Sequence, residues 1–300
     1  MKETFFTVVN PAAGGGRCQK LFGPAQDLLR AGGLRLEVVE TSRPGMATDL
    51  TRDAYACGYR HFLAVGGDGT SYEIVNGLFP GAEQGERPVL GFLPLGTGNS
   101  FLRDFSDRGL EGSLEALLAG RQRRCDVLRM THKDGVIHYI NLLSVGFAAD
   151  VNMTRSQVFA GWGELGYFLS IFTRLAQLKR RAFPLRIEGD GELDRRRCLF
   201  LSFNNSKYTG GTMMIAPKAE VDDGLIEYVR WGPIGRIGLI RNLSTLYDGT
   251  HIHHPLAECK ATARIEFDLD GPVDVMVDGE PRRLHCQVLD VLPGALQVVV

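Results

Sequence analysis

The sequence predicts an α/β domain with a doubly wound parallel sheet over residues 1–124, followed by a β-rich, sandwich-like domain over residues 125–291. The first prediction rests on short apolar runs that alternate with helical patterns at a spacing typical of βαβ units. The second rests on a change after Arg124, where short runs of β type predominate and many alternate polar with apolar residues. A chain of 300 residues is long enough to form a core in each domain.

In the first half, strands and helices are expected in alternation. Strands are expected at Thr4–Val9, Leu34–Val39, Phe62–Val65 and Val89–Leu93, and helices at Cys18–Ala31, Ala47–Cys57 and Ser71–Leu78. Three of these strands run directly into loops rich in Gly, Asn and Thr. Because ligands of open α/β sheets bind beyond the carboxyl ends of the strands, we expect these loops to converge on one binding site.

In the second half, strands are expected to outnumber helices. They are expected at Cys125–Arg129, Val136–Leu143, Leu185–Ile187, Cys198–Asn204, Gly224–Arg230, Ala263–Leu269, Val273–Val277 and Leu284–Leu289. Helices are expected at Gly163–Arg181 and roughly at Gly235–Asp248. The apolar side of the first of these helices either packs in the core or lines a lipid slot. Leu296–Val300 is apolar enough to be a buried strand, and residues 292–300 are candidates for a return to the first domain.

The charge balance limits the choice of partners. A formal net charge of -1 gives no overall attraction to nucleic acid or to an anionic membrane, and no nucleic-acid partner is expected. Local basic clusters are either solvated faces or lipid-surface patches, and they lie at Arg121–Arg124, Lys179–Arg181, Arg195–Arg197 and Arg282–Arg283.

Cysteine usage and hydropathy indicate the compartment. The six cysteines are isolated and form no C-x-x-C pair, which is typical of reduced thiols in the cytoplasm. No apolar run reaches the ~18 residues that span a bilayer, and the opening residues do not resemble a secretory signal. We therefore expect a cytoplasmic protein without a transmembrane segment.

The loop Gly66-Gly67-Asp68-Gly69-Thr70 carries the strongest chemical signal. It follows an apolar strand and precedes a helix. Glycines let backbone N–H groups approach an anion, and a helix N-terminus adds partial positive charge. A carboxylate in such a place is expected to handle Mg²⁺ or a proton. The alternative is a tight strand-to-helix turn in which Asp68 caps the helix.

This loop resembles the GGDGT motif of the diacylglycerol, sphingosine and ceramide kinases, of the NAD kinases and, more loosely, of the phosphofructokinases. Four further strings resemble the diacylglycerol-kinase type of lipid kinase: Asn10–Arg17 is similar to N-P-x-x-G-x-x-R, Pro94–Asn99 to P-x-G-T-G-N, Ala216–Gly224 to A-P-x-A-x-x-D-D-G, and Asp278–Glu280 to D-G-E. The resemblance spans essentially the whole chain and is nearest to the bacterial soluble members. NAD kinases would need an Asn-Glu dipeptide after GGDG, and the chain has none there.

The resemblance implies an NAD-kinase/diacylglycerol-kinase-like fold and an enzyme that uses ATP and Mg²⁺. It implies transfer of the γ-phosphoryl group to the hydroxyl of diacylglycerol, a sphingoid base or a similar lipid, reached by transient association with the membrane surface. A kinase of a soluble acceptor such as NAD is the alternative. The oligomeric state is left open. The implied nucleotide-binding residues are Asn10, Pro11, Gly14, Arg17, Thr41, Gly66, Gly67, Asp68, Gly69, Thr70, Glu73, Gly96, Thr97, Gly98 and Asn99.

Carboxylates are the expected catalytic groups, because one must accept the proton of the attacking hydroxyl. The resemblance makes Glu280 the expected base, with Asp278 and Asp68 holding the metal or tuning the base, although Asp68 could itself be the base. Asp278-Gly279 is also expected to form a hairpin turn.

The family resemblance further implies a Mg²⁺ site in which Asp223 is a side-chain ligand and the carbonyls of Glu220 and Leu225 assist. A simple turn is the alternative interpretation of this segment. His251–His254 is a weak candidate for a zinc site, because it lacks Cys or carboxylate partners at ligand spacing.

Two departures from the family pattern concern the lipid. Ser100 follows Asn99 where many bacterial diacylglycerol kinases have Asp, and Thr212 stands where a third Gly is common. Both leave the identity of the lipid open.

Overall fold

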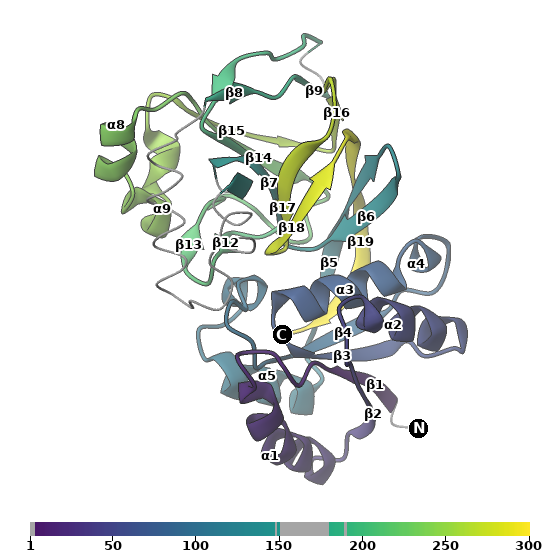
Figure 1. Ribbon diagram of the computed structural model, residues 1–300. Helices are drawn as coiled ribbons and strands as arrows, with labels where there is room; N and C mark the ends of the chain where they lie inside the picture. Colours follow the sequence, from purple (N-terminus) through teal and green to yellow (C-terminus); the bar gives the residue numbers. More distant parts are fainter. Residues whose placement is uncertain (1–3, 148, 151–179, 189–190) are drawn as a thin grey trace. The chain divides into compact units, whose positions relative to one another are not determined.

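The computed structural model describes residues 4–147, 149–150, 180–188 and 191–300 (Figure 1). The chain divides into two compact units, one formed by residues 1–127 and 292–300 and the other by residues 128–291. The expected helix Gly163–Arg181 lies outside the described residues except for its last two positions.

The first unit is built on a parallel sheet with the order β2-β1-β3-β4. Its strands are β1 (Thr4–Val9), β2 (Arg35–Glu40), β3 (His61–Gly66) and β4 (Val89–Pro94). The end of β19 (Cys286–Val299) adds a further parallel strand, because Gln297 and Val298 pair with Val89 and Leu90 of β4. The final apolar residues of the chain therefore complete the sheet of the first unit.

Helices cover both faces of this sheet (Figure 1). They are α1 (Arg17–Ala31), α2 (Met46–Ala56), α3 (Asp68–Leu78), α4 (Gly81–Gln84) and α5 (Gly109–Ala119), with a 3₁₀ turn η1 (Phe101–Asp104). On one face, Leu29 of α1 and Leu117 of α5 pack with Leu63 and Leu93 of the sheet. On the other face α2 and α3 lie against each other. The layers are those of a doubly wound α/β domain, as predicted.

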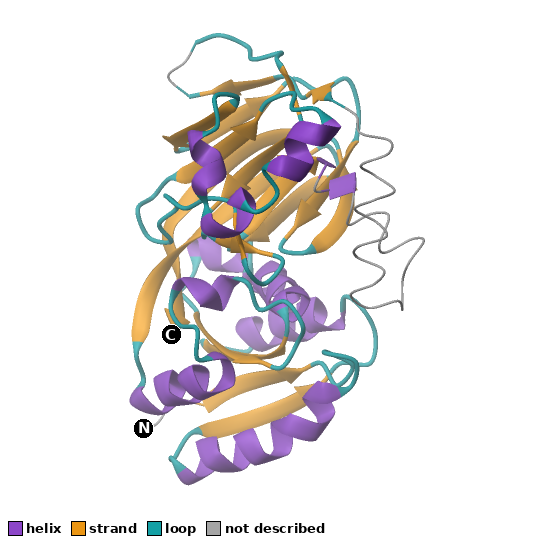
Figure 2. Cartoon of the chain, turned by 90° about the vertical axis from the view of Figure 1, so that its left-hand side faces the viewer, coloured by secondary structure: helices purple, strands orange, loops and turns teal. Residues whose placement is uncertain are grey.

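The described part of the second unit contains a six-stranded sheet, a second layer of strands and two small two-stranded sheets (Figure 2). The six-stranded sheet has the order β15-β14-β11-β7-β17-β18, and all its described pairings are antiparallel. The second layer contains β9, β16, β5, β6 and the first part of β19, which belong to a nine-stranded sheet together with β1–β4. The rings of Phe203 in β11 and Phe267 in β16 lie 5.3 Å apart, so the six-stranded sheet and the second layer pack face to face. A sandwich-like second domain is therefore confirmed.

The strands and helices of the second unit have the following bounds. The strands are β5 (Gln122–His132), β6 (Gly135–Tyr139), β7 (Leu142–Gly146), β8 (Arg181–Ala182), β9 (Leu185–Ile187), β10 (Arg197–Cys198), β11 (Phe200–Asn204), β12 (Tyr208–Thr209), β13 (Met213–Met214), β14 (Ile226–Trp231), β15 (Ala257–Thr262), β16 (Arg264–Phe267), β17 (Val273–Val277) and β18 (Glu280–Leu284). The helices are α8 (Arg236–Arg241), α9 (Thr245–Asp248) and the 3₁₀ turn η2 (Thr250–His253).

Some boundaries in the second unit differ from the sequence prediction. The single strand expected at Val136–Leu143 is interrupted, because the backbone at residues 140–142 turns toward a buried carboxylate. Leu284–Leu289 and Leu296–Val300 belong largely to one continuous strand, β19. Strand β15 was not predicted, although its residues Ala257–Thr262 alternate between apolar and polar; they are mostly half-buried and include Ala, Glu and Lys, which favour strands only weakly.

Two further properties bear on the compartment and the membrane. None of the helices that the structure describes is both long and apolar enough to cross a bilayer. All six cysteines, each within the described residues, are free. Burial raises the pKa of the Cys198 thiol to about 12, so this thiol is neutral at physiological pH.

Candidate active site

Two glycine-containing loops of the first unit lie in direct backbone contact. The Gly96 N–H donates a hydrogen bond of 2.8 Å to the carbonyl of Gly66. A Cβ atom added to Gly96 would lie 2.4 Å from the Cα atom of Gly67 and 2.7 Å from its nitrogen. No side chain fits there, so glycine at residue 96 is a requirement of the contact between the two loops.

Helix α3 begins inside the first of these loops with an open N-terminus. Gly67 is its N-cap, and no side chain caps the helix. The N–H groups of Thr70 and Ser71 donate to the carbonyl of Gly67 at 3.0 and 3.2 Å. Within the described chain, the N–H groups of Asp68 and Gly69 donate to no protein acceptor. Free N–H groups at a helix N-terminus are suited to bind an anion such as phosphate.

The loop from Asn10 to Arg17 joins the same site. Asn10 donates its N–H to the carbonyl of Val65 at 2.9 Å, and its side-chain amide lies 3.5 Å from the hydroxyl of Thr70. Gly14, Gly15 and Gly16 all have positive φ, at 61°, 67° and 86°. A Cβ on Gly14 would lie 2.7 Å from the carbonyl oxygen of Leu95, so this loop also contacts the loop after β4. The three predicted loops therefore converge at the carboxyl ends of β1, β3 and β4.

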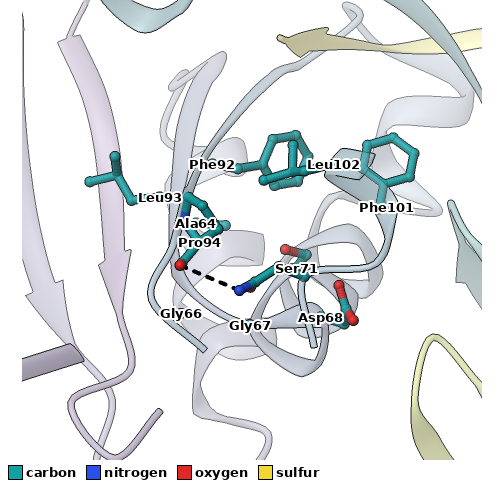
Figure 3. A pocket seen from close by; sticks show the side chains of 11 residues that line it. Ala64, Gly66, Gly67, Asp68, Ser71, Phe92, Leu93, Pro94, Phe101 and Leu102 are labelled. Carbon is teal, nitrogen blue, oxygen red and sulfur yellow. Dashed lines mark hydrogen bonds between the residues drawn. The ribbon is translucent and has the colours of Figure 1, made fainter. Parts of the chain in front are cut away.

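Asp68 lies beside a small pocket at this point (Figure 3). Its carboxylate accepts the N–H of Ser100 at 3.0 and 3.1 Å. The apolar part of the pocket is formed by Ala64, Phe92, Leu93, Phe101 and Leu102. Burial raises the pKa of Asp68, and its hydrogen bonds to Ser100 and Phe101 offset that rise only in part. Because Gly67 is the N-cap, the structure does not support the alternative in which the Asp68 side chain caps α3.

The raised pKa of Asp68 predicts how the stability of the protein depends on pH. An acid with a higher pKa in the folded state binds more protons there than in the unfolded state, so stability falls as the pH rises through that interval. As the pH rises from the ordinary pKa of an aspartate to the raised pKa of Asp68, the free energy of unfolding of the wild type should fall relative to that of Asp68→Asn. Urea denaturation of both proteins at several pH values measures the difference. Parallel pH profiles would contradict the prediction.

The other predicted nucleotide-binding residues have different surroundings. Thr97 is exposed, and Thr41 donates its hydroxyl to the carbonyl of Val9 at 3.3 Å. The side chain of Asn99 donates to the carbonyls of Pro94 and Gly96 at 3.3 and 3.0 Å, and thereby holds the loop after β4 together. Arg17 is exposed at the start of α1.

Glu73 is expected among the nucleotide-binding residues and also supports a neighbouring helix. In the structure its two carboxylate oxygens accept the N–H groups of Gly45 at 2.8 Å and Ala47 at 3.1 Å, at the start of α2. A carboxylate in this position stabilises the N-terminus of a helix. Its contact with the nucleotide stays a prediction.

The carboxylates near the end of the chain belong to a hairpin in the second unit. Val277 pairs with Glu280 across β17 and β18, and Asp278 and Gly279 form the turn with φ values of 46° and 86°. The predicted turn is therefore present. Asp278 is 4% exposed, and its carboxylate accepts the N–H groups of Ile140 at 3.2 Å, Asn141 at 3.1 Å and Leu142 at 3.0 Å. These contacts engage both oxygens of Asp278 with the backbone of residues 140–142. Its expected role in holding the metal or tuning the base stays a prediction.

The segment that holds Asp278 is itself braced by two residues after β11. Asn205 donates its side-chain amide to the carbonyl of Ile140 at 2.9 Å and its N–H to the carbonyl of Asn141 at 2.8 Å. Ser206 donates its hydroxyl to the side-chain oxygen of Asn141. Sequence reasoning missed this network, and the available signal was the polar run Asn204-Asn205-Ser206 at the end of an apolar strand.

Glu280 lies two residues beyond the anchored Asp278. It is the half-buried first residue of β18. Among the described residues, none forms a hydrogen bond or ion pair with its side chain. The hairpin therefore offers a free carboxylate at Glu280 on a backbone that Asp278 holds in place.

Anchoring by Asp278 predicts a loss of stability on substitution. Asp278→Asn replaces one acceptor oxygen by a donor that faces backbone N–H groups. We expect the free energy of unfolding to fall by about 2 kcal/mol, the typical value for a hydrogen bond to a charged group. Asp274→Asn is a control in the same hairpin, because its ion pair with Arg283 spans 4.0 Å at the surface and should cost less than ~1 kcal/mol. Equal losses of unfolding free energy in the two variants would show that Asp278 does not anchor the hairpin.

Comparison with known families agrees with this geometry. The model of the diacylglycerol kinase catalytic domain matches residues 4–130, and the model of the YegS C-terminal NAD kinase beta sandwich-like domain matches residues 141–300. The chain belongs to the diacylglycerol kinase family. It is accordingly a kinase that transfers a phosphoryl group to an alcohol.

Several relatives support this family assignment. Diacylglycerol kinases from Staphylococcus aureus strains MRSA252 and Newman are 29% identical over 286 residues, which cover 93% of this chain and 87% of theirs. Two solved structures of diacylglycerol kinase-type proteins from Bacillus anthracis str. Sterne have the same fold. Their TM-scores are 0.79 and 0.76 at 22% and 24% identity, with 100% of this chain and 96% and 98% of theirs covered.

The residues predicted to form the site of this diacylglycerol kinase family member belong to both units. The loops at 10–17, 66–70 and 94–99 belong to the first unit, and Asp278 and Glu280 belong to the second. The predicted Mg²⁺ ligands Glu220, Asp223 and Leu225 also lie in the second unit. The side chain of Asp223 accepts the N–H of Leu225 at 2.9 Å, which forms a local turn.

The histidine-rich segment has a structural role. His251 is 1% exposed, and its ring nitrogens lie 3.3 Å from the carbonyl of Thr245 and 3.1 Å from that of Ile215. In the described residues, no group of three or more His, Cys, Asp or Glu side chains is arranged to hold a metal. The zinc interpretation of His251–His254 is therefore wrong for the described chain.

Proposed function

We propose that this kinase transfers the γ-phosphoryl group of ATP, with Mg²⁺, to the hydroxyl group of a lipid such as diacylglycerol. One observation carries the proposal: three glycine-containing loops of the first unit converge around the open N-terminus of α3. The free N–H groups of Asp68 and Gly69 suit a phosphate chain, and the positive φ values of Gly14–Gly16 suit close approach of the backbone.

The proposed nucleotide contacts follow from this arrangement. Backbone N–H groups of the three loops bind the triphosphate, and the exposed Arg17 at the start of α1 neutralises part of its charge. Thr41 and Thr97 are proposed to contact the nucleotide from the loops after β2 and β4. Asn99 acts indirectly, because it holds Pro94 and Gly96 in position.

The proposed chemical step uses Glu280 as the general base. The oxygen of the lipid hydroxyl attacks the γ-phosphorus, and its proton passes to the carboxylate of Glu280. The bond between the γ-phosphorus and the bridging oxygen of ADP breaks, and ADP leaves with that oxygen. The free side chain of Glu280 supports this assignment, and Asp278 is a positioning residue that fixes the hairpin. Asp68, with its raised pKa, is the alternative base.

The donor groups around Asp223 fit a hard cation. Burial raises the pKa of Asp223, and the negative charges of Glu220 and Asp222 raise it further, so a cation bound here would relieve repulsion. Carboxylate and carbonyl oxygens are the ligands that Mg²⁺ prefers. We propose that Asp223 and the carbonyls of Glu220 and Leu225 hold Mg²⁺ and thereby support the second unit. A second Mg²⁺ would accompany ATP and neutralise charge that develops on its phosphates.

The acceptor is proposed to be a lipid because the S. aureus relatives are diacylglycerol kinases over nearly the same length. The test is incubation with Mg²⁺, ATP labelled at the γ-position and either a mixed lipid extract or NAD. Label that enters the organic phase supports the proposal. Label that stays in an aqueous product with NAD would instead identify the kinase as one of a soluble acceptor.

A further inference from the structure

Helices α8 and α9, with the turn between them, carry a group of exposed apolar side chains. Ile237 and Ile240 are 68% and 59% exposed, and their spacing of three residues places them on the same side of α8. Leu243 in the turn is 38% exposed and Tyr247 in α9 is 49% exposed. These four side chains, here named the α8–α9 patch, are half of the eight large apolar side chains exposed in the described chain, so apolar exposure is concentrated there.

The patch is fixed to the core of the second unit from its other side. Leu239 and Leu246 are 3% and 7% exposed, and they pack with Trp231 in a hydrophobic cluster. The turn is held by hydrogen bonds from the Asn242 amide to the carbonyl of Gly238 at 2.8 Å and from the Thr245 hydroxyl to the carbonyl of Asn242 at 2.6 Å. The core therefore uses one side of these helices, and the opposite apolar side is left on the surface.

Cationic side chains flank the α8 part of the patch, and the one acidic residue of the two helices is Asp248 at the end of α9. Arg236 and Arg241 lie at the two ends of α8, and the sequence from residue 233 to residue 247 contains no Asp or Glu. The guanidinium of Arg180 lies 3.9 Å from the Cβ position of Gly235, at the start of the same helix. Arg241 forms no ion pair within the described part of the chain.

Arginines in two of the basic clusters noted in the sequence, Arg121–Arg124 and Arg195–Arg197, form ion pairs. Arg121 pairs with Glu115 at 3.1 Å, Arg195 with Asp268 at 3.1 Å and Arg196 with Asp194 at 2.7 Å. Their charges are thus offset by neighbouring carboxylates. Beside the α8–α9 patch, Arg241 forms no ion pair with any described residue, and residues 233–247 contain no acidic side chain.

We propose that the α8–α9 patch docks on the surface of an anionic phospholipid bilayer. Apolar side chains flanked by arginines match the boundary between lipid headgroups and acyl chains, where apolar groups insert and cations meet lipid phosphates. Ile237 and Ile240 enter the acyl region, while Arg236 and Arg241 lie at the headgroups. The inference deepens the proposed function, because a kinase of a membrane lipid must reach its acceptor at a bilayer.

The test measures vesicle binding without any phosphorylation. The full chain is sedimented with vesicles of equal parts phosphatidylglycerol and phosphatidylcholine that contain no acceptor lipid and no ATP. The double variant Ile237→Ser/Ile240→Ser should partition at least about tenfold more weakly than the wild type, since two exposed isoleucines lose their transfer into an apolar phase. The matched control is Leu28→Ser/Leu118→Ser, which removes two apolar side chains of the first unit that are 57% and 45% exposed. Its binding should equal that of the wild type.

Charge and self-association are tested separately. Arg236→Gln/Arg241→Gln should bind vesicles more weakly and with less dependence on salt. Three results would overturn the proposal: no binding by the wild type, equal binding by the isoleucine variant, or dissociation of a wild-type dimer by that variant while vesicle affinity is unchanged. The last result would identify a contact between two copies of the chain. Because the vesicles hold no acceptor, a failure to bind them would not contradict the proposed kinase function. Likewise, a failure to phosphorylate a lipid would not contradict docking of the patch on a bilayer.

Discussion

Glu280→Gln lowers turnover by about 10²- to 10⁴-fold, the usual contribution of a general base. The substitution keeps the size of the side chain and removes its capacity to accept the proton of the lipid hydroxyl. Because Glu280 makes no hydrogen bond or ion pair with its side chain in the described chain, the variant should fold as the wild type does. Steady-state kinetics with a lipid acceptor should show the loss in kcat, and calorimetry should show unchanged affinity for the nucleotide.

Glu266→Gln is the matched control for this experiment. Glu266 is also a strand glutamate of the second unit, and its surface ion pair with Arg264 spans 3.3 Å. A surface pair of this kind contributes little, so the control should retain full turnover. If Glu280→Gln were also fully active, Glu280 would not be the base. Asp68 would then become the candidate, to be tested with Asp68→Asn in the same assay.

Gly96→Ala abolishes or strongly weakens nucleotide binding. Its added methyl group would fall 2.4 Å from the Cα atom of Gly67, which is backbone and cannot rotate away. The two loops must therefore separate, and the hydrogen bond between Gly96 and Gly66 is lost with the geometry of the anion site. We expect an affinity loss of at least about tenfold and a cost in stability of about 1–3 kcal/mol, as for an overpacked core.

Gly23→Ala provides the comparison for this variant. Gly23 lies inside α1, and apart from its chain neighbours nothing lies within 4 Å of its Cβ position. Alanine there should leave nucleotide affinity unchanged. Its effect on the free energy of unfolding should be smaller than that of Gly96→Ala, because the helix preference of alanine over glycine is opposed by the contact of its Cβ with the ring of Pro24. Titration calorimetry with a non-hydrolysable ATP analogue and urea denaturation measure both effects. Unchanged affinity in Gly96→Ala would contradict the proposed role of the loop contact.

The first unit was predictable because its signals are local. Buried parallel strands such as Phe62–Val65 are continuous apolar runs, and each glycine-containing loop follows its strand in the sequence. Parallel strands bring their carboxyl ends to one edge of the sheet, so convergence of the loops followed from the alternation of elements. The contact between Gly96 and Gly67 is a specific instance of that rule.

The second unit was less predictable because its decisive contacts join residues far apart in sequence. Asp278 accepts hydrogen bonds from the N–H groups of residues 140–142, and no local sequence pattern at residue 278 or at residues 140–142 predicts these bonds. The resemblance placed Asp278 beside the expected base and Glu73 at the nucleotide, but it did not predict that both carboxylates accept backbone N–H groups. Strand β15 was missed although its residues alternate, because its Ala, Glu and Lys favour strands only weakly and the strand is defined by its pairing with β14.

The most direct test of the account is the fate of the γ-phosphate when diacylglycerol is the only acceptor. Phosphorus NMR of the reaction with Mg²⁺ and ATP should show a new phosphomonoester in the lipid phase and an equal amount of ADP in water. Glu280→Gln should form both far more slowly. If the folded enzyme releases inorganic phosphate instead, or produces no lipid phosphomonoester, this chain does not phosphorylate diacylglycerol.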